Sequence, residues 1–195
     1  MKTINNTVVG IIIFFVIIPI ITIAQPVLSD VAKVENFSLE DYEGNIHSLS
    51  DYKDSAAIVI IFIATECPVS NDYNTRMEAI YEEYMEKGIA FIGINSNKEE
   101  DVVRIGNHAQ ENQLKFTILK DLQNIVADLF GASFTPEAYV LNDSYEVLYH
   151  GRIDNSRDES NVTAQDLKNA LDEILNGDAV SKPRTKAFGC TIKRV

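Results

Sequence analysis

The sequence predicts an α/β protein: a mixed central sheet flanked by helices on both faces, with an N-terminal hairpin and a C-terminal tail. Two observations lead to this prediction. Residues 57–64 form a short, β-branched and unbroken apolar run, which is typical of a strand buried on both faces. From residue 69 onward, apolar side chains recur at the three- and four-residue spacing of a helix. Strand and helix patterns then alternate along the chain, which indicates an α/β fold.

The first half of the chain is expected to form a hairpin, two buried strands and two helices. In order, these are a hairpin of residues 37–39 and 46–49, a strand over 57–64, a helix over 69–84, a strand over 89–94 and a helix over 99–114. Gly88 ends the first helix, because glycine readily adopts the left-handed conformation found at helix C-termini. In the second helix, Val102, Ile105 and Ala109 are spaced to face the core.

The second half is expected to add a strand, a helix, an antiparallel hairpin and a last helix. In order, these are a strand over 116–119, a helix over 122–130, hairpin strands within 131–141 and 145–149, a polar loop over 151–161, a helix over 163–175 and a tail over 178–195. Gly131 and Gly177 end the two helices. Thr163 and Asp166 open the last helix in the pattern of a capping box.

The first 24 residues differ from the rest. Lys2 precedes an apolar run over residues 8–23, and small residues stand at Thr22 and Ala24, near the end of this run. The run is long for a signal peptide and short for a spanning helix, so a cleaved signal and an uncleaved membrane anchor both remain open. In either case, residues 25–195 are expected to form one domain outside the cytoplasm, either periplasmic or secreted.

The net charge argues against one class of partner, and the cysteine content limits the redox chemistry that is possible. The formal net charge is −12 at pH 7, and so acidic a surface repels phosphate backbones, which argues against a nucleic-acid partner. Only two cysteines are present, Cys67 and Cys190. They form one structural bridge, one redox pair, or two separate thiols.

Cys67 lies where the buried strand ends and the helix begins. Pro68 suits the first helical position, where its missing N–H costs nothing. The free N–H groups and positive dipole end of a helix N-terminus favour a thiolate there. Ser70 lies one turn further on and is placed to donate a hydrogen bond to that thiolate. The sequence therefore predicts a reactive thiol at Cys67.

Several motifs together resemble a known family. These are CPVSNDYNTRM from Cys67, GINSNKEE from Gly93, TPEAYVL from Thr135, YHGRIDN from Tyr149 and GCTIKR from Gly189. They resemble a peroxiredoxin-like branch of the redoxin (alkyl hydroperoxide reductase/thiol-specific antioxidant) family, which implies a thioredoxin-like fold and thiol redox chemistry. In this superfamily the Thr135-Pro136 loop carries a cis-proline facing the thiol. The sequence departs from the family pattern in two places. Ala64 stands where peroxiredoxins have threonine or serine, and Ser70 where related reductases have a second cysteine.

The resemblance implies a thiol-dependent oxidoreductase. In such an enzyme the Cys67 thiolate is expected to attack a peroxide or a protein disulfide, which gives a sulfenic acid or a mixed disulfide. Cys190 or an external thiol donor then resolves this product. Thr65, Pro68, Ser70, Thr135 and Pro136 are the expected substrate-binding residues. Neither a metal nor an organic cofactor is expected, because no His/Cys spacing matches a metal site. The alternatives are a thiol metal-binding chaperone, a non-catalytic binding module and a fold merely stapled by its cysteines.

Overall fold

The computed structural model describes residues 33–195, so the predicted signal or anchor at 1–24 lies outside the described residues. The predicted α/β class is confirmed by a mixed seven-stranded sheet of order β2-β1-β5-β4-β3-β7-β8. The strands are β1 (Ser38–Asp41), β2 (Ile46–Ser48), β3 (Ala57–Phe62), β4 (Ile89–Asn95), β5 (Thr117–Lys120), β6 (Phe134–Thr135), β7 (Glu137–Leu141), β8 (Val147–Gly151) and β9 (Cys190–Thr191). Within residues 33–195, no helix is both long enough and apolar enough to cross a membrane.

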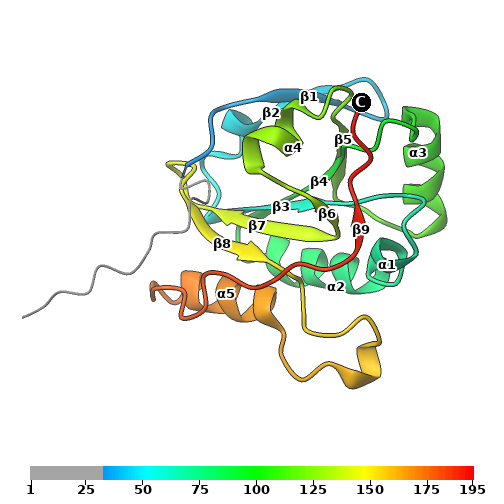
Figure 1. Ribbon diagram of the computed structural model, residues 1–195. Helices are drawn as coiled ribbons and strands as arrows, with labels where there is room; N and C mark the ends of the chain where they lie inside the picture. The colour runs from blue at the N-terminus through cyan, green and yellow to red at the C-terminus, as the bar shows by residue number, and fades with distance from the viewer. Residues whose placement is uncertain (1–32) are drawn as a thin grey trace, which may run out of the picture.

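Helices cover both faces of this sheet. The α-helices are α1 (Pro68–Asn71), α2 (Asn74–Met85), α3 (Val102–Glu111), α4 (Ile125–Phe130) and α5 (Asp166–Leu175), with short 3-10 turns η1 (Leu49–Tyr52) and η2 (Glu159–Asn161). Side chains of α2, α3 and α5 share one core cluster, and those of α4 belong to a second cluster on the opposite face. Figure 1 shows α4 on one side of the sheet and α2 and α5 on the other.

β3 is the central strand, as predicted from its continuous apolar run. It pairs in parallel with β4 and antiparallel with β7. Val59 and Ile61 pack into the cluster under α2, while Ile58 and Ile60 pack into the cluster under α4. All four side chains are at most 1% exposed. The turn that carries Cys67 directly follows β3. Because β3 is buried on both faces, it holds the start of this turn in a fixed position.

The helix predicted over 69–84 is in fact two helices. α1 ends at Asn71, and the Tyr73 N–H bonds the carbonyl of Ser70, three residues back, instead of four. Such a tight turn interrupts the α-helical pattern. α2 then begins at Asn74, and Tyr73, between the two helices, is only 1% exposed.

α3 starts later than predicted and turns one predicted core residue outward. The Asp101 side chain accepts the Arg104 N–H at 2.8 Å, which caps the helix there. Val102 is 39% exposed, whereas Ile105 and Ala109 are buried as expected. The predicted apolar face was therefore one residue too wide.

The starts of the last two helices were also predicted wrongly. Asn124 adopts a left-handed conformation with φ of 58°, so α4 begins at Ile125 and Leu122 lies on the surface. The capping box expected before α5 does not form. Gln165 is the N-cap residue and makes no side-chain cap, while the Thr163 hydroxyl accepts a hydrogen bond within the preceding loop.

The segment predicted as one strand over 131–141 is divided between two sheets. β7 pairs with β8, whereas β6 pairs antiparallel with β9 of the tail, with Thr135 opposite Cys190 and Phe134 opposite Thr191. Figure 1 shows the tail running beside β6 and close to α1. This small second sheet brings the distant cysteine to the end of β3.

Candidate active site at the Cys67–Cys190 pair

Cys67 is the N-cap residue of α1 and is only 4% exposed. Pro68 occupies the first helical position, and the Ser70 N–H donates to the Cys67 sulfur at 3.3 Å. The same sulfur lies 3.3 Å from the Thr135 carbonyl oxygen. The sulfur is thus held between a helix N-terminus, which favours negative charge, and the loop that carries Pro136.

Cys67 and Cys190 form a disulfide whose Cα atoms are 5.9 Å apart. Of the three possibilities that the sequence left open for the two cysteines, the disulfide excludes two separate thiols and leaves a structural bridge or a redox pair. Among the described residues, the only cis peptide bond joins Thr135 to Pro136, which confirms the expected cis-proline facing the thiol. The carbonyl of Thr135 approaches Cys67, and its backbone pairs with Cys190. One loop therefore contacts both cysteines.

The other predicted binding residues have different surroundings. Ser70 is fully buried, and its hydroxyl accepts the Ala64 N–H at 3.2 Å, so its link to the sulfur is through the backbone. Pro68 is exposed at the start of α1. Thr65 borders a separate cleft beside α3, and its buried hydroxyl oxygen has no hydrogen-bond partner within the described part of the chain. The structure therefore places backbone atoms of Ser70 and Thr135 at the Cys67 sulfur, whereas Thr65 lines the separate cleft.

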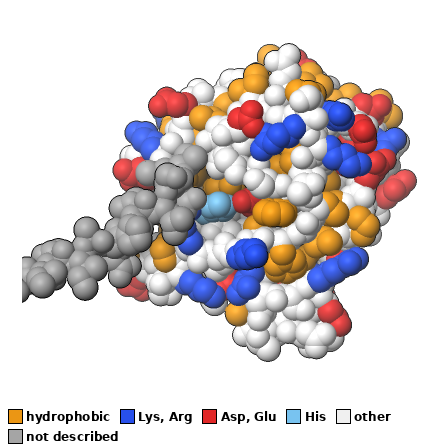
Figure 2. Space-filling view, viewed as in Figure 1, with side chains coloured by type: hydrophobic (Ala, Val, Ile, Leu, Met, Phe, Trp, Pro, Cys, Tyr) orange, Lys and Arg blue, Asp and Glu red, His pale blue; other side chains and the backbone are white. Residues whose placement is uncertain are grey.

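A small cavity of about 80 Å³ lies against the disulfide. Its lining includes Ala64, Cys67, Glu100, Thr135, Cys190 and Lys193. This volume admits a molecule the size of water or hydrogen peroxide. Glu66 also borders it but forms an ion pair with Arg104. Residues 178–195, the tail, contain five basic residues. Figure 2 shows basic side chains on the face of the molecule that the tail crosses.

Glu100 also lines this cavity, although it is not among the residues predicted for the site. It is 3% exposed, and its carboxylate accepts the backbone N–H groups of Thr65 at 2.6 Å and Glu66 at 3.3 Å. The Asn95 amide donates to the same carboxylate at 2.6 Å. Glu100 therefore fixes the turn immediately before Cys67. The GINSNKEE motif at the end of β4 was the available signal, because polar groups at the carboxyl ends of strands often form sites in α/β sheets.

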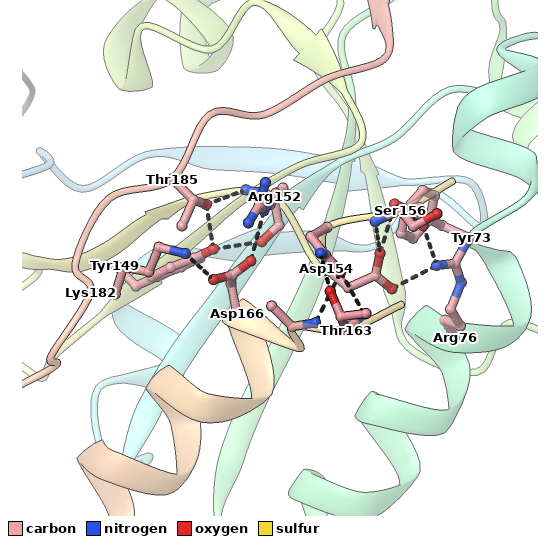
Figure 3. A network of polar contacts seen from close by, with 12 residues as sticks. Tyr73, Arg76, Tyr149, Arg152, Asp154, Ser156, Thr163, Asp166, Lys182 and Thr185 are labelled. Carbon is pink, nitrogen blue, oxygen red and sulfur yellow. Dashed lines mark hydrogen bonds and ion pairs between the residues drawn. The ribbon is translucent and has the colours of Figure 1, made fainter. Parts of the chain in front are cut away.

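Arg76 and Arg152 each bind a buried carboxylate. Arg76 lies on α2. Its guanidinium pairs with Asp154 at 2.6 Å and stacks on the Tyr73 ring at 3.6 Å (Figure 3). Burial, reinforced by the hydrogen bond to Asp154, raises the pKa of Tyr73.

Arg152 pairs with Asp166 at 2.7 Å, on the far side of the same network (Figure 3). Lys182 of the tail also contacts Asp166, at 2.8 Å. Burial tends to raise the pKa of Asp166, but the hydrogen bonds from Lys182 and Arg152 outweigh it and hold this pKa below its usual value. The contact therefore joins the start of the tail to α5.

Replacing Asp154 with alanine is expected to lower the free energy of unfolding by roughly 3–5 kcal/mol, because it leaves the Arg76 guanidinium buried and unpaired. The Arg76 and Asp154 side chains are only 10% and 6% exposed. The matched control, Asp72→Ala, removes an exposed pair with Arg157 and should cost less than about 1 kcal/mol. Denaturant unfolding would measure the free energy of unfolding of both variants. An equal loss in the two variants would contradict a stabilising role for the buried Arg76–Asp154 pair. Disulfide content should remain unchanged.

The three histidines bind polar side chains. His47 contacts Asp41, His108 contacts Asn74, and His150 contacts Glu137 at 2.6 Å while stacking on a tyrosine ring. Over residues 33–195, no group of three or more His, Cys, Asp or Glu side chains is arranged to hold a metal ion.

Residues 31–156 match the AhpC/TSA family. The chain is 30% identical over 113 residues to the thiol-disulfide oxidoreductase ResA of Halalkalibacterium halodurans, covering 58% of this chain and 62% of ResA. It is 31% identical over 121 residues to the chloroplastic peroxiredoxin Q of Triticum aestivum, covering 58% of this chain and 54% of that protein. The chain thus matches less than two thirds of the length of either relative.

Among solved structures, the hypothetical protein SMc02350 from Sinorhizobium meliloti 1021 is similar over most of its length. It shares 30% sequence identity, has a TM-score of 0.80 and covers 86% of this chain and 96% of its own. More distant structures, among them thiol-disulfide oxidoreductases, share the fold alone. The expected thioredoxin-like fold is therefore confirmed.

Proposed function

Because this chain belongs to the AhpC/TSA family, we propose that it is a thiol-dependent oxidoreductase in which Cys67 attacks the substrate and Cys190 resolves the product. The observation that carries this proposal is the Cys67–Cys190 disulfide, formed at a helix N-terminus beside a cis-proline. Such a position favours the thiolate, which is the reactive form of cysteine. The Ser70 N–H and the Thr135 carbonyl oxygen each lie 3.3 Å from the Cys67 sulfur, which supports a role for this loop and this helix start.

The first candidate for the substrate is a hydroperoxide. The Cys67 thiolate attacks one peroxide oxygen, the O–O bond breaks, and an alcohol or water leaves after taking up a proton. Cys67 is then a sulfenic acid. The Cys190 sulfur attacks it, and the sulfenic hydroxyl leaves as water with the proton of Cys190. An external dithiol returns the disulfide to two thiols and is itself oxidised.

Access to the site favours a small substrate. The tail strand β9 occupies the edge of Thr135, where an extended peptide would otherwise pair. The cavity at the sulfurs has room for hydrogen peroxide but not for a peptide. A peroxide therefore needs no displacement of the tail, whereas a protein disulfide does.

Mass spectrometry tests the proposal. The reduced protein is treated with one equivalent of hydrogen peroxide, and free thiols and sulfenic acid are trapped. We expect rapid loss of the Cys67 thiol, followed by a Cys67–Cys190 disulfide. Two unreacted thiols would contradict a peroxidase. A bond that resists mild reductant in the oxidised protein would identify a structural staple.

Disulfide exchange is the second candidate, favoured by the likeness to ResA, which is described as a thiol-disulfide oxidoreductase. Here the Cys67 thiolate attacks a disulfide and releases one thiolate, and Cys190 then releases the other. Cys67 that ignores peroxide but forms a trapped mixed disulfide with an oxidised protein substrate would select this candidate.

We also infer an extracytoplasmic location, because residues 1–24 have the pattern of a signal or anchor and disulfides persist outside the cytoplasm. Cell fractionation with N-terminal sequencing of the mature protein distinguishes the two. A cleaved signal yields a new N-terminus near Gln25. An anchor leaves the chain whole in the membrane fraction, and a whole chain in the cytosol would contradict export.

A further inference from the structure

A group of buried polar side chains lies where β4 and β5 end, next to the site. Its members, which we call the polar hub, are at most 5% exposed: Asn95, Ser96, Asn97, Glu100, Lys120, Asp121 and Asn124. Burying polar groups is costly unless they are hydrogen-bonded, and such networks hold a defined geometry when their partners are present. The hub contacts both chain segments that carry the cysteines.

On the Cys67 side, the contact is through Glu100. Its carboxylate receives the N–H groups of Thr65 and Glu66, the two residues before Cys67. The Asn95 amide donates to the same carboxylate at 2.6 Å. Bonds to a charged acceptor are stronger than neutral ones, so this turn is firmly held.

On the Cys190 side, the contact is through Asn97 and Asn124. The Asn97 side-chain oxygen accepts the Lys193 N–H at 2.8 Å, and the Lys193 carbonyl accepts the Lys98 N–H at 3.0 Å. The Asn124 side-chain oxygen accepts the Val195 N–H at 2.8 Å. The chain after Cys190 is therefore attached by bonds that do not involve the disulfide.

Lys120 joins the two sides of the hub. Its ammonium donates to the Asn97 carbonyl at 2.6 Å and to the Asn95 side-chain oxygen at 3.3 Å. Asn95 in turn contacts Glu100. A continuous chain of hydrogen bonds thus runs from the turn before Cys67 to the backbone after Cys190.

We propose that the polar hub is a positioning device that keeps Cys190 beside Cys67 while the disulfide is open. Resolution of oxidised Cys67 then needs no unfolding of the tail, because the attacking sulfur is already within reach. This inference rests on the proposed function. It assigns a role to the GINSNKEE motif and to the last residues of the chain.

Rapid-mixing kinetics with peroxide separate the two steps: oxidation of Cys67 and formation of the disulfide. In Asn97→Ala, the ratio of the second rate constant to the first should fall about tenfold, the effect of one lost buried hydrogen bond. Asn97→Asp keeps the acceptor oxygen and should restore the ratio. Asn107→Ala, an exposed asparagine on α3, is the matched control. An unchanged ratio in Asn97→Ala would overturn the proposal.

Hydrogen exchange on the reduced wild-type protein gives a second test that needs no peroxide. The Ile192 and Lys193 amides, bonded to the Ser133 carbonyl and to Asn97, should remain protected after reduction. Exchange at the rate of an unfolded chain would show that the tail leaves and would overturn the inference. Failure of the peroxidase proposal appears separately, as the absence of any Cys67 oxidation.

Discussion

Replacing Cys67 with serine is expected to abolish turnover of both peroxide and disulfide substrates, with a loss of more than about a thousandfold, because a hydroxyl at neutral pH cannot replace the attacking thiolate. The side chain is 4% exposed and takes part in the disulfide, so serine is a close steric substitute. Peroxide consumption and reduction of a model disulfide, each coupled to an external dithiol, would measure the loss.

Cys190→Ser is the matched control for this prediction. It removes the resolving sulfur but leaves Cys67, so the first equivalent of peroxide should still be consumed, and a Cys67 sulfenic acid should accumulate. Turnover that survives in Cys67→Ser would contradict the proposed function. Equal and complete loss of the first oxidation in both variants would show that the thiols act as a unit and that Cys67 alone is not the nucleophile.

Replacing Gly189 with alanine is expected to prevent the disulfide by moving the tail away from the cis-proline loop. A Cβ at this position would lie 2.0 Å from the Thr135 carbonyl oxygen and 2.8 Å from its carbonyl carbon. Both are backbone atoms, so no side-chain rearrangement relieves the contact. We expect the equilibrium constant for disulfide formation to fall at least about a hundredfold, from combined backbone strain and overpacking.

The measurement is the fraction of disulfide at equilibrium in glutathione buffers of known potential, with thiols trapped by an alkylating agent. Gly177→Ala is the matched control. Gly177 also has a positive φ, of +78°, but a Cβ there meets nothing within 4 Å. It should lose stability without changing the disulfide constant. A wild-type constant in Gly189→Ala would show that the β6–β9 pairing does not bring the sulfurs together.

Local patterns in the sequence determined much of this protein. The apolar run of β3, the helix start at Pro68 and the helix end at Gly131 each depend on a few neighbouring residues, and each was predicted correctly. The cis bond before Pro136 was also expected, from the family resemblance. Side-chain periodicity and helix-end residues act over about ten residues, so they predict helices and strands before any tertiary contact is known.

Only the tertiary structure decided the rest. Leu122 has helical spacing yet lies on the surface, because the left-handed Asn124 interrupts that helix. The partner of Cys67 lies 123 residues further along the chain. It is brought to Cys67 by the pairing of β9 with β6, and the sequence of residues 178–195 has no pattern that predicts this strand. The roles of Glu100 and Asn97 arise because they accept backbone N–H groups on opposite sides of the disulfide. Such contacts form between segments that are distant in sequence, so no short-range pattern predicts them.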